Sequence, residues 1–389
     1  MTTASLLFWA AALLVVYTFV GYPLLMAAWA RWRPRPLRPQ PWLPRVAVVV
    51  VMHNEAARAR AKLASCLQQD YPADKLQVVV VSDGSNDDTA EQIRSLHSPR
   101  VRLLAFEERR GKAACLNDAV AACDEEVIVF TDARQALNPR AVSHLVETLS
   151  DPTVGAVSGE LLFVPEGVRE FGQGVDAYWR YEKSIRRSEA SVHSVPGATG
   201  ALYALRRSAF RAISPRTILD DVAIPMQACL DGLRVVFDGR AQAFDQAAAA
   251  IEAERRRKVR TLAGNYQLIE LMPQLLLPWR NPILLQFVSH KLLRLLAPWA
   301  LAAALLASAV LAAQGVPLFA GLLAIQLAFY GLALLPWVLP AGRSFRLARV
   351  AQAFVALNGF AVLGLFEYLG NREAHLWRKA PTAESGEAR

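Results

Sequence analysis

The chain has 389 residues, of which 54% are hydrophobic, and its mean hydropathy is +0.23. This balance excludes an ordinary soluble protein and predicts membrane segments beside one large or two moderate domains. Four scattered cysteines, none in a C-x-x-C pair, exclude a disulfide-rich or zinc-finger protein, and we attribute much of the net charge of +9 to basic clusters beside the membrane segments rather than to nucleic-acid binding.

The N-terminal segment 5–30 holds no charged side chain and is long enough to cross a bilayer core. No basic residue precedes it and it is longer than the apolar core of a signal peptide, so we interpret it as an anchor helix. A linker rich in proline and arginine follows at 31–45. The positive-inside rule then places the N-terminus outside and the following domain in the cytoplasm.

Short β-branched runs alternate with helical patterns after the linker. Strands are predicted at 46–52, 76–82, 101–106 and 126–132, and helices at 56–68, 88–96 and 112–123. This alternation predicts βαβ units and an α/β domain with helices on both faces of the sheet. The region from 154 to 260 is mixed, with strands predicted at 154–163, 200–207 and 233–238 and helices at 168–190 and 221–232.

Apolar patterns return in the last third of the chain. Residues 264–293 have apolar side chains at helical spacing, broken by prolines, which predicts amphipathic helices on the membrane surface. Apolar segments at 295–313, 316–339 and 350–370 predict three transmembrane helices within 294–370. Residues 371–389 form a tail.

Three polar clusters stand where predicted strands end. They are His53-Asn54-Glu55, Asp83-Gly84-Ser85 and Thr131-Asp132-Ala133-Arg134. Helix capping and turn formation explain any one of them. Three at the same edge of a parallel sheet predict a shared binding site, because ligands lie beyond the carboxyl ends of such strands. In the second cluster we expect Gly84 to make the turn, Asp83 to face a ligand, and Asp88 with Thr89 to cap the next helix.

The chain contains, in order, the motifs V-x-x-H-N-E, V-V-V-S-D-G-S-N-D-D-T, R-R-G-K-A-A-C-L-N, F-T-D-A-R, L-D-D-V-A-I-P and R-x-x-R-T-x-x-G. In this ordered set the chain resembles a membrane-bound family 2 glycosyltransferase related to polysaccharide synthases. The resemblance covers nearly the whole chain. It implies a GT-A (Rossmann-like) nucleotide-sugar domain at 46–263 with N- and C-terminal transmembrane helices. Neither G-x-G-x-x-G nor G-x-x-x-x-G-K-[ST] occurs, which argues against a dinucleotide or Walker-type site.

The resemblance also implies which residues bind the donor. These nucleotide-sugar contacts are Asn54, Glu55, Asp83, Gly84, Lys112, Asn117 and Arg257. Carboxylates accept hydrogen bonds from a nucleobase and from ribose hydroxyls, and a lysine at a helix start suits phosphate. Asp132 would bind a divalent cation, Mg²⁺ or Mn²⁺, on the donor diphosphate. Arg134 stands where the family has the second acid of Asp-x-Asp.

The catalytic residues follow from the same resemblance. Asp220 and Asp221 match the family's acidic pair, and Asp221 would be the general base that takes the proton of the acceptor hydroxyl. Arg260 would stabilise charge on the leaving diphosphate. The family's Q-x-x-R-W element is altered, since Arg257 replaces its glutamine and Thr261 replaces its tryptophan, which bears on processivity.

The expected function is inverting transfer of a sugar from a nucleotide sugar, a UDP-sugar, to a lipid-linked or polysaccharide acceptor. The expected site is the bacterial inner membrane, with the catalytic domain in the cytoplasm and with membrane lipid and polysaccharide-assembly proteins as partners. Two alternatives stay open: a polyprenyl-phosphate glycosyltransferase, and a non-catalytic membrane subunit of a polysaccharide synthase.

Overall fold

In the part of the chain that the structure describes, one mixed sheet of eight strands forms the centre of the α/β domain, in the order β3-β2-β1-β4-β7-β6-β8-β5. The structure is a computed structural model that describes residues 2–164, 172–246, 251–339, 345–371, 373 and 375–376. The strands are β1 (Val46–Met52), β2 (Leu76–Asp83), β3 (Val101–Phe106), β4 (Val127–Phe130), β5 (Ala136–Leu137), β6 (Val154–Val164), β7 (Tyr203–Arg206) and β8 (Arg234–Gln246).

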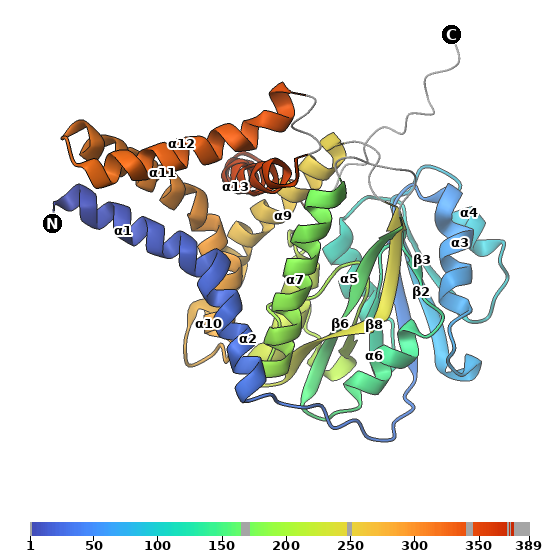
Figure 1. The fold of residues 1–389 in the computed structure, drawn as a ribbon. Helices are drawn as coiled ribbons and strands as arrows, with labels where there is room; N and C mark the ends of the chain where they lie inside the picture. The colour runs from blue at the N-terminus through green and yellow to red at the C-terminus, as the bar shows by residue number, and fades with distance from the viewer. Residues whose placement is uncertain are drawn as a thin grey trace, which may run out of the picture.

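The first four strands of the chain form the parallel half of this sheet. β1 pairs in parallel with β2 and β4, and β2 pairs in parallel with β3. All seven residues of β1 are buried, as expected for a valine-rich strand that is covered on both faces. Helices α3 (Ala56–Leu67) and α4 (Thr89–Arg94) lie on one side of the sheet, and α5 (Lys112–Ala121) lies on the other (Figure 1). The predicted α/β class is confirmed.

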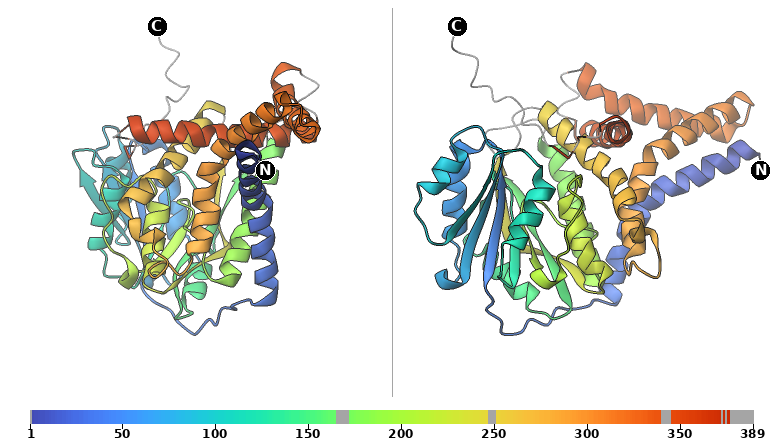
Figure 2. Two further views of the ribbon diagram at one scale, coloured as in Figure 1. Left: turned by 90° about the vertical axis from the view of Figure 1, so that its left-hand side faces the viewer. Right: turned by 180° about the vertical axis from the view of Figure 1, so that it is seen from behind.

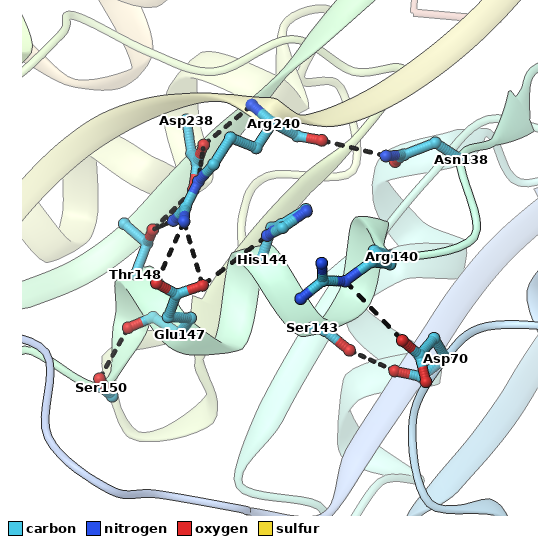
Figure 3. Close-up of polar contacts among 10 residues, drawn as sticks. All are labelled: Asp70, Asn138, Arg140, Ser143, His144, Glu147, Thr148, Ser150, Asp238 and Arg240. Carbon is cyan, nitrogen blue, oxygen red and sulfur yellow. Dashed lines mark hydrogen bonds and ion pairs between the residues drawn. The ribbon is translucent and has the colours of Figure 1, made fainter.

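The second half of the domain continues the same sheet. β7 is antiparallel to both β4 and β6, while β8 is parallel to β6. Helix α6 (Ala141–Leu149) packs on this half, and an arginine on β8 attaches it there (Figure 3). The Arg240 guanidinium lies 2.8 Å from the Asp238 carboxylate and 3.1 Å from that of Glu147, and the Thr148 hydroxyl donates to Asp238 at 2.7 Å.

Three longer helices complete the domain: α7 (Gly172–Val192), α8 (Asp220–Leu230) and α9 (Ile251–Leu271). The described part of α7 agrees with the predicted helix, whose residues 168–171 lie outside the described residues. α9 continues past residue 263, so the predicted limit of the catalytic domain falls inside a helix. Short helical turns follow or connect these elements: η2 (Ala73–Lys75), η3 (Arg207–Ala209), η4 (Pro273–Leu276), α10 (Leu284–Phe287) and η5 (Val288–Leu292).

Four described helical segments are long and apolar enough to cross a membrane: Thr3–Trp32, Leu284–Ala313, Pro317–Val338 and Arg346–Gly370. They comprise α1 (Thr3–Val16), η1 (Tyr17–Gly21), α2 (Tyr22–Trp32), α10, η5, α11 (Leu293–Ala313), α12 (Pro317–Val338) and α13 (Arg346–Gly370). α1, α11 and α12 project from one side of the catalytic domain, whereas α13 runs across α11 and α12 (Figures 1 and 2).

The end of α13 leads back to the catalytic domain. A Cβ built on Gly111 would lie 3.2 Å from Leu376 Cδ2 and 3.5 Å from His375 Cδ2. The first residues of the predicted tail therefore lie beside the start of α5. Most of the tail, including residues 377–389, falls outside the described residues.

A buried polar cluster joins the α/β domain to the long apolar helices. His290 of η5 lies between two carboxylates of α7, with Nδ1 2.8 Å from Glu189 and Nε2 3.0 Å from Glu182. Arg294 of α11 lies 2.6 Å from Glu182, and the Tyr22 hydroxyl of α2 donates to Glu189. Because each group has a partner of opposite charge or a hydrogen bond, the cluster fixes α7 against α2 and α11 despite its burial.

Candidate active site

The turn after β2 is built around a buried aspartate and a glycine. Asp83 is 1% exposed, and its carboxylate accepts hydrogen bonds from the amides of Arg110 (2.6 Å) and Gly111 (3.0 Å). Gly84 has a φ of +58°, and a Cβ there would lie 2.5 Å from the Arg109 amide nitrogen. Only glycine fits this position. Asp83 therefore positions the loop that leads to Lys112. The sequence motif predicted only that Asp83 faces a ligand.

The loop after β1 is attached to the same turn. Asn54 has a φ of +55°, and its side-chain oxygen accepts the Asn86 amide at 2.9 Å. The Glu55 amide donates to the Thr89 hydroxyl at 2.8 Å. The expected cap of α4 is corrected here: the Asp88 side chain forms no cap bond, and the Asp87 carboxylate instead accepts the Thr89 amide at 3.0 Å.

Lys112 lies between two of the predicted acids. Its ammonium nitrogen is 2.8 Å from Asp132 Oδ1 and 3.1 Å from Asp220 Oδ2. Burial alone would lower the pKa of Lys112, but Asp132 and Asp220 raise it above its ordinary value. The lysine is therefore charged and joins the edge of β4 to the start of α8, which is the place where a diphosphate would meet a cation.

Asp221 is held beside this pair by a glycine loop. The Gly200 amide donates to Asp221 Oδ2 at 3.0 Å, and a Cβ on Gly200 would lie 3.4 Å from Asp221 Oδ2 and 3.7 Å from Asp132 Oδ2. Gly197 has a φ of +115° and packs on Val222, so it is required by the turn. Burial, and then the charge of Asp220, raise the pKa of Asp221 to about 6. A carboxylate with this pKa is a stronger base than an exposed aspartate and is still largely ionised at neutral pH.

Arg260 of α9 lies close enough to three carboxylates to feel their charges. Burial lowers the pKa of Arg260, and the charges of Asp220, Asp221 and Asp132 act against that shift. Tyr203 of β7 is also close to these acids. It is fully buried, burial raises its pKa, and its hydroxyl has no hydrogen-bond partner among the described residues. The structure thus brings Lys112, Asp132, Asp220, Asp221 and Arg260 together at one edge of the sheet.

The residues offer a cation only part of a binding site. No group of three or more His, Cys, Asp or Glu side chains that could hold a metal occurs in the described ranges. Asp132 is a single hard oxygen donor with a 39% exposed side chain. Mg²⁺ and Mn²⁺ accept one protein carboxylate together with substrate phosphates and water, so Asp132 fits a cation that arrives on a diphosphate.

Arg134 does not take the place of the missing second acid. Its guanidinium lies 2.7 Å from Asp245, a residue of β8 that is 3% exposed, and Gln135 donates to the same carboxylate at 2.9 Å. This ion pair attaches the segment after β4 to β8. A neighbouring lysine on α3 has a similar structural role: buried Lys62 donates to Thr131 and to the Gln135 carbonyl, each at 2.7 Å.

Asn117 and Arg257, which were predicted to contact the donor, have contacts within the protein. Both polar atoms of the Asn117 amide bond to the backbone of Ile213, at 2.8 and 3.0 Å. Asn117 is therefore corrected from a donor contact to a clamp between α5 and the segment before α8. The guanidinium carbon of Arg257 lies 5.7 Å from the Phe163 ring centre, within cation–π range, at the end of β6.

Comparison with known proteins identifies this arrangement. Residues 47–214 match the model of glycosyl transferase family 2. The chain carries a family 2 glycosyltransferase domain. Its parallel strands β1–β4, apart from Val46, the glycine loop at Gly197 and Gly200, and Asp132 fall within the matched residues.

Three similar proteins match this chain over the following lengths. A mannosyltransferase from Pyrobaculum calidifontis, solved in complex with GDP-Man and Mn²⁺, is 28% identical and has a TM-score of 0.67; the match covers 94% of this chain and 99% of that one. A poly-beta-1,6-N-acetyl-D-glucosamine synthase from Staphylococcus epidermidis is 22% identical over 58% of this chain and 55% of its own length. An N-acetylglucosaminyltransferase from Rhizobium meliloti is 31% identical over 44% of this chain and 41% of its own length.

These matches confirm the GT-A fold and glycosyl transfer as the activity of the glycosyltransferase domain. The chain spans about half the length of the curated relatives it matches. The match to the Pyrobaculum calidifontis structure, in contrast, includes the regions that flank the family 2 domain.

Proposed function

We propose that this chain is an inverting glycosyltransferase that moves a sugar from a nucleotide sugar, a UDP-sugar, to a lipid-linked or polysaccharide acceptor. The single observation that carries the proposal is the meeting of Asp221 with Asp132, Asp220, Lys112 and Arg260 at the carboxyl edge of the sheet. One basic carboxylate, two cationic side chains and one exposed acid supply every role that direct displacement of a diphosphate requires.

Each residue has a defined task in this reaction. Asp221 accepts the proton of the acceptor hydroxyl while that oxygen forms its bond to the anomeric carbon and the bond to the donor diphosphate breaks. Lys112 and Arg260 compensate the negative charge that develops on the diphosphate. Asp132 would hold a divalent cation, which supplies further positive charge to the same phosphates. No second carboxylate is needed as a covalent nucleophile, so the product anomer is inverted.

The membrane setting supports a hydrophobic or membrane-bound acceptor. The positive-inside rule applied to the basic linker 31–45 supports a cytoplasmic catalytic domain, and the bacterial relatives support the inner membrane of a bacterium as its site. The N-acetylglucosamine named for two of the relatives favours UDP-GlcNAc as the first donor to test. The Pyrobaculum calidifontis structure holds GDP-Man, so that donor belongs in the same panel.

The test is release of nucleoside diphosphate by the purified full chain in detergent with Mn²⁺ or Mg²⁺, with each nucleotide sugar and with membrane lipid extract. We expect one donor to be consumed, only when lipid extract is present, and the product to have the opposite anomeric configuration. A product with the donor's configuration would refute direct displacement. Donor binding without turnover under every condition would favour the non-catalytic subunit.

A further inference from the structure

Three consecutive backbone amides of the glycine loop either bind Asp221 or anchor the loop beside it. The Ala198 amide donates to the Asp221 carbonyl at 2.7 Å, and the Gly200 amide donates to the Asp221 carboxylate at 3.0 Å. The Thr199 amide, between these two, donates instead to the Ser158 hydroxyl at 3.1 Å. Ser158 therefore sets the position of the two amides that contact Asp221.

Ser158 is a fully buried serine at an irregular point of β6. The register between β6 and β8 shifts between Ser158 and Glu160, and such irregularities redirect the side chains beside them. A serine hydroxyl can accept two hydrogen bonds and donate one. Here it accepts from Thr199 and from Arg186 Nη2, the latter at 2.7 Å, and it donates to the Gly159 carbonyl at 3.1 Å. Alanine at this position would leave both donors without their partner.

Arg186 of α7 is held over the same part of the sheet. Its guanidinium carbon lies 5.2 Å from the ring centre of Phe237, the residue of β8 that pairs with Ser158. Arg186 also lies close enough to Asp221 for their opposite charges to interact. Because the buried polar cluster fixes α7 against the long apolar helices, the hydrogen bonds from Arg186 to the glycine loop connect Asp221 with this helix as well.

We propose that Ser158 and Arg186 are positioning residues for the catalytic base Asp221. This inference rests on the proposed function, in which Asp221 takes the proton of the acceptor hydroxyl. Ser158 holds the glycine loop by the Thr199 amide, and the loop keeps the Gly200 amide on the carboxylate. Arg186 fixes the Ser158 hydroxyl. Without these bonds the carboxylate shifts relative to the acceptor, and a misplacement of about 1 Å can lower a rate by roughly 100-fold.

The first test measures kcat and the KM for the nucleotide sugar in the purified full chain in detergent, with Mn²⁺ and lipid extract. We expect Ser158→Ala and Arg186→Met to lower kcat about 10- to 100-fold with little change in KM, because these residues support the base and not the donor contacts. Arg186→Lys keeps one charged donor for the Ser158 hydroxyl and should recover most of the loss. Ser184→Ala and Arg187→Met change exposed residues of the same helix and should behave like the parent protein.

The second test repeats both changes in Asp221→Asn, with radiolabelled nucleotide sugar to detect slow transfer. Residues that act only through the base lose their effect once the base is absent, so Ser158→Ala should lower the remaining transfer by less than about twofold. Thermal unfolding and calorimetric binding of the donor show whether each variant is folded. If Ser158→Ala does not fold, Arg186→Met, which changes a partly exposed side chain, serves in both tests.

Two results would overturn the inference: a parent-like kcat in the folded variants, or losses that add in full to that of Asp221→Asn. The second result would mean that Ser158 and Arg186 have a general packing role. Failure of the proposed function would be recognised separately, because Asp221→Asn alone would then transfer sugar at the parent rate.

Discussion

Gly264 is a sensitive position because α9, which carries Arg260, packs closely there against the residues just before α8. It lies one turn after Arg260 on α9, and a Cβ there would be 2.5 Å from Leu219 Cγ and 2.9 Å from Ile218 Cγ2. Ordinary contact begins near 3.4 Å, so Gly264→Ala requires a displacement of about 0.9 Å. Leu219 is 7% exposed and directly precedes Asp220, so it has little space in which to move.

The expected cost follows from two opposing effects. Alanine is favoured over glycine inside a helix by about 1 kcal/mol, but overpacking of a dense site costs roughly 1–3 kcal/mol. We expect Gly264→Ala to lower the unfolding free energy slightly and to lower kcat about 10- to 100-fold, since displacements near 1 Å in an active site have effects of that size.

Steady-state release of nucleoside diphosphate and thermal unfolding of the same samples would measure both effects. Gly359→Ala on α13 is the control, because nothing lies within 4 Å of the Cβ it would add. If Gly264→Ala were as active and as stable as Gly359→Ala, the close packing of α9 on the start of α8 would not position the catalytic groups.

Three further predictions concern other parts of the molecule. Gly84→Ala should abolish donor binding, measured by titration calorimetry, because its Cβ would meet the Arg109 amide; Gly232→Ala, which has a φ of +84° but open space, should cost only about 1 kcal/mol and leave donor binding intact. Chelation of divalent cations by EDTA should stop turnover, and added Mn²⁺ should restore it. Full activity in EDTA would refute the assignment of a cation to Asp132. Burial and two nearby arginines lower the pKa of His193 from 6.5 to about 4, so the unfolded chain binds this proton first as the pH falls. Thermal unfolding should therefore show a loss of about 2 kcal/mol between pH 7.5 and pH 5, and His193→Gln should reduce that loss.

The sheet and the place of the site were predictable because they depend on local patterns. The valine-rich run of β1 and the polar clusters at the ends of β1, β2 and β4 are visible in the sequence. The rule that ligands lie at the carboxyl edge of a parallel sheet predicts that these clusters meet. Strand β5 has only two residues, which is too short to show a periodic pattern. It forms only because it pairs with β8, more than a hundred positions away in the chain.

Partners of individual side chains could not be predicted in the same way. Asn117 lies in a donor-site motif, yet its amide bonds to Ile213, almost a hundred residues away. Arg134 replaces an acid in the Asp-x-Asp pattern, and only the fold shows that it pairs with Asp245. Lys62 follows no motif at all and is recognised only by its burial beneath Thr131. Such contacts depend on tertiary placement rather than on spacing along the chain.

The most direct test of the central claim compares Asp221→Asn with the parent protein, with donor and lipid extract at saturation. The change removes the base but keeps the size of the side chain and its oxygen facing Gly200. We predict unchanged nucleotide-sugar affinity and a fall in transfer of roughly 10²- to 10⁴-fold, the usual contribution of a general base. Transfer at the parent rate with intact donor binding would contradict the assignment of Asp221 and would favour a phosphate acceptor that needs no base.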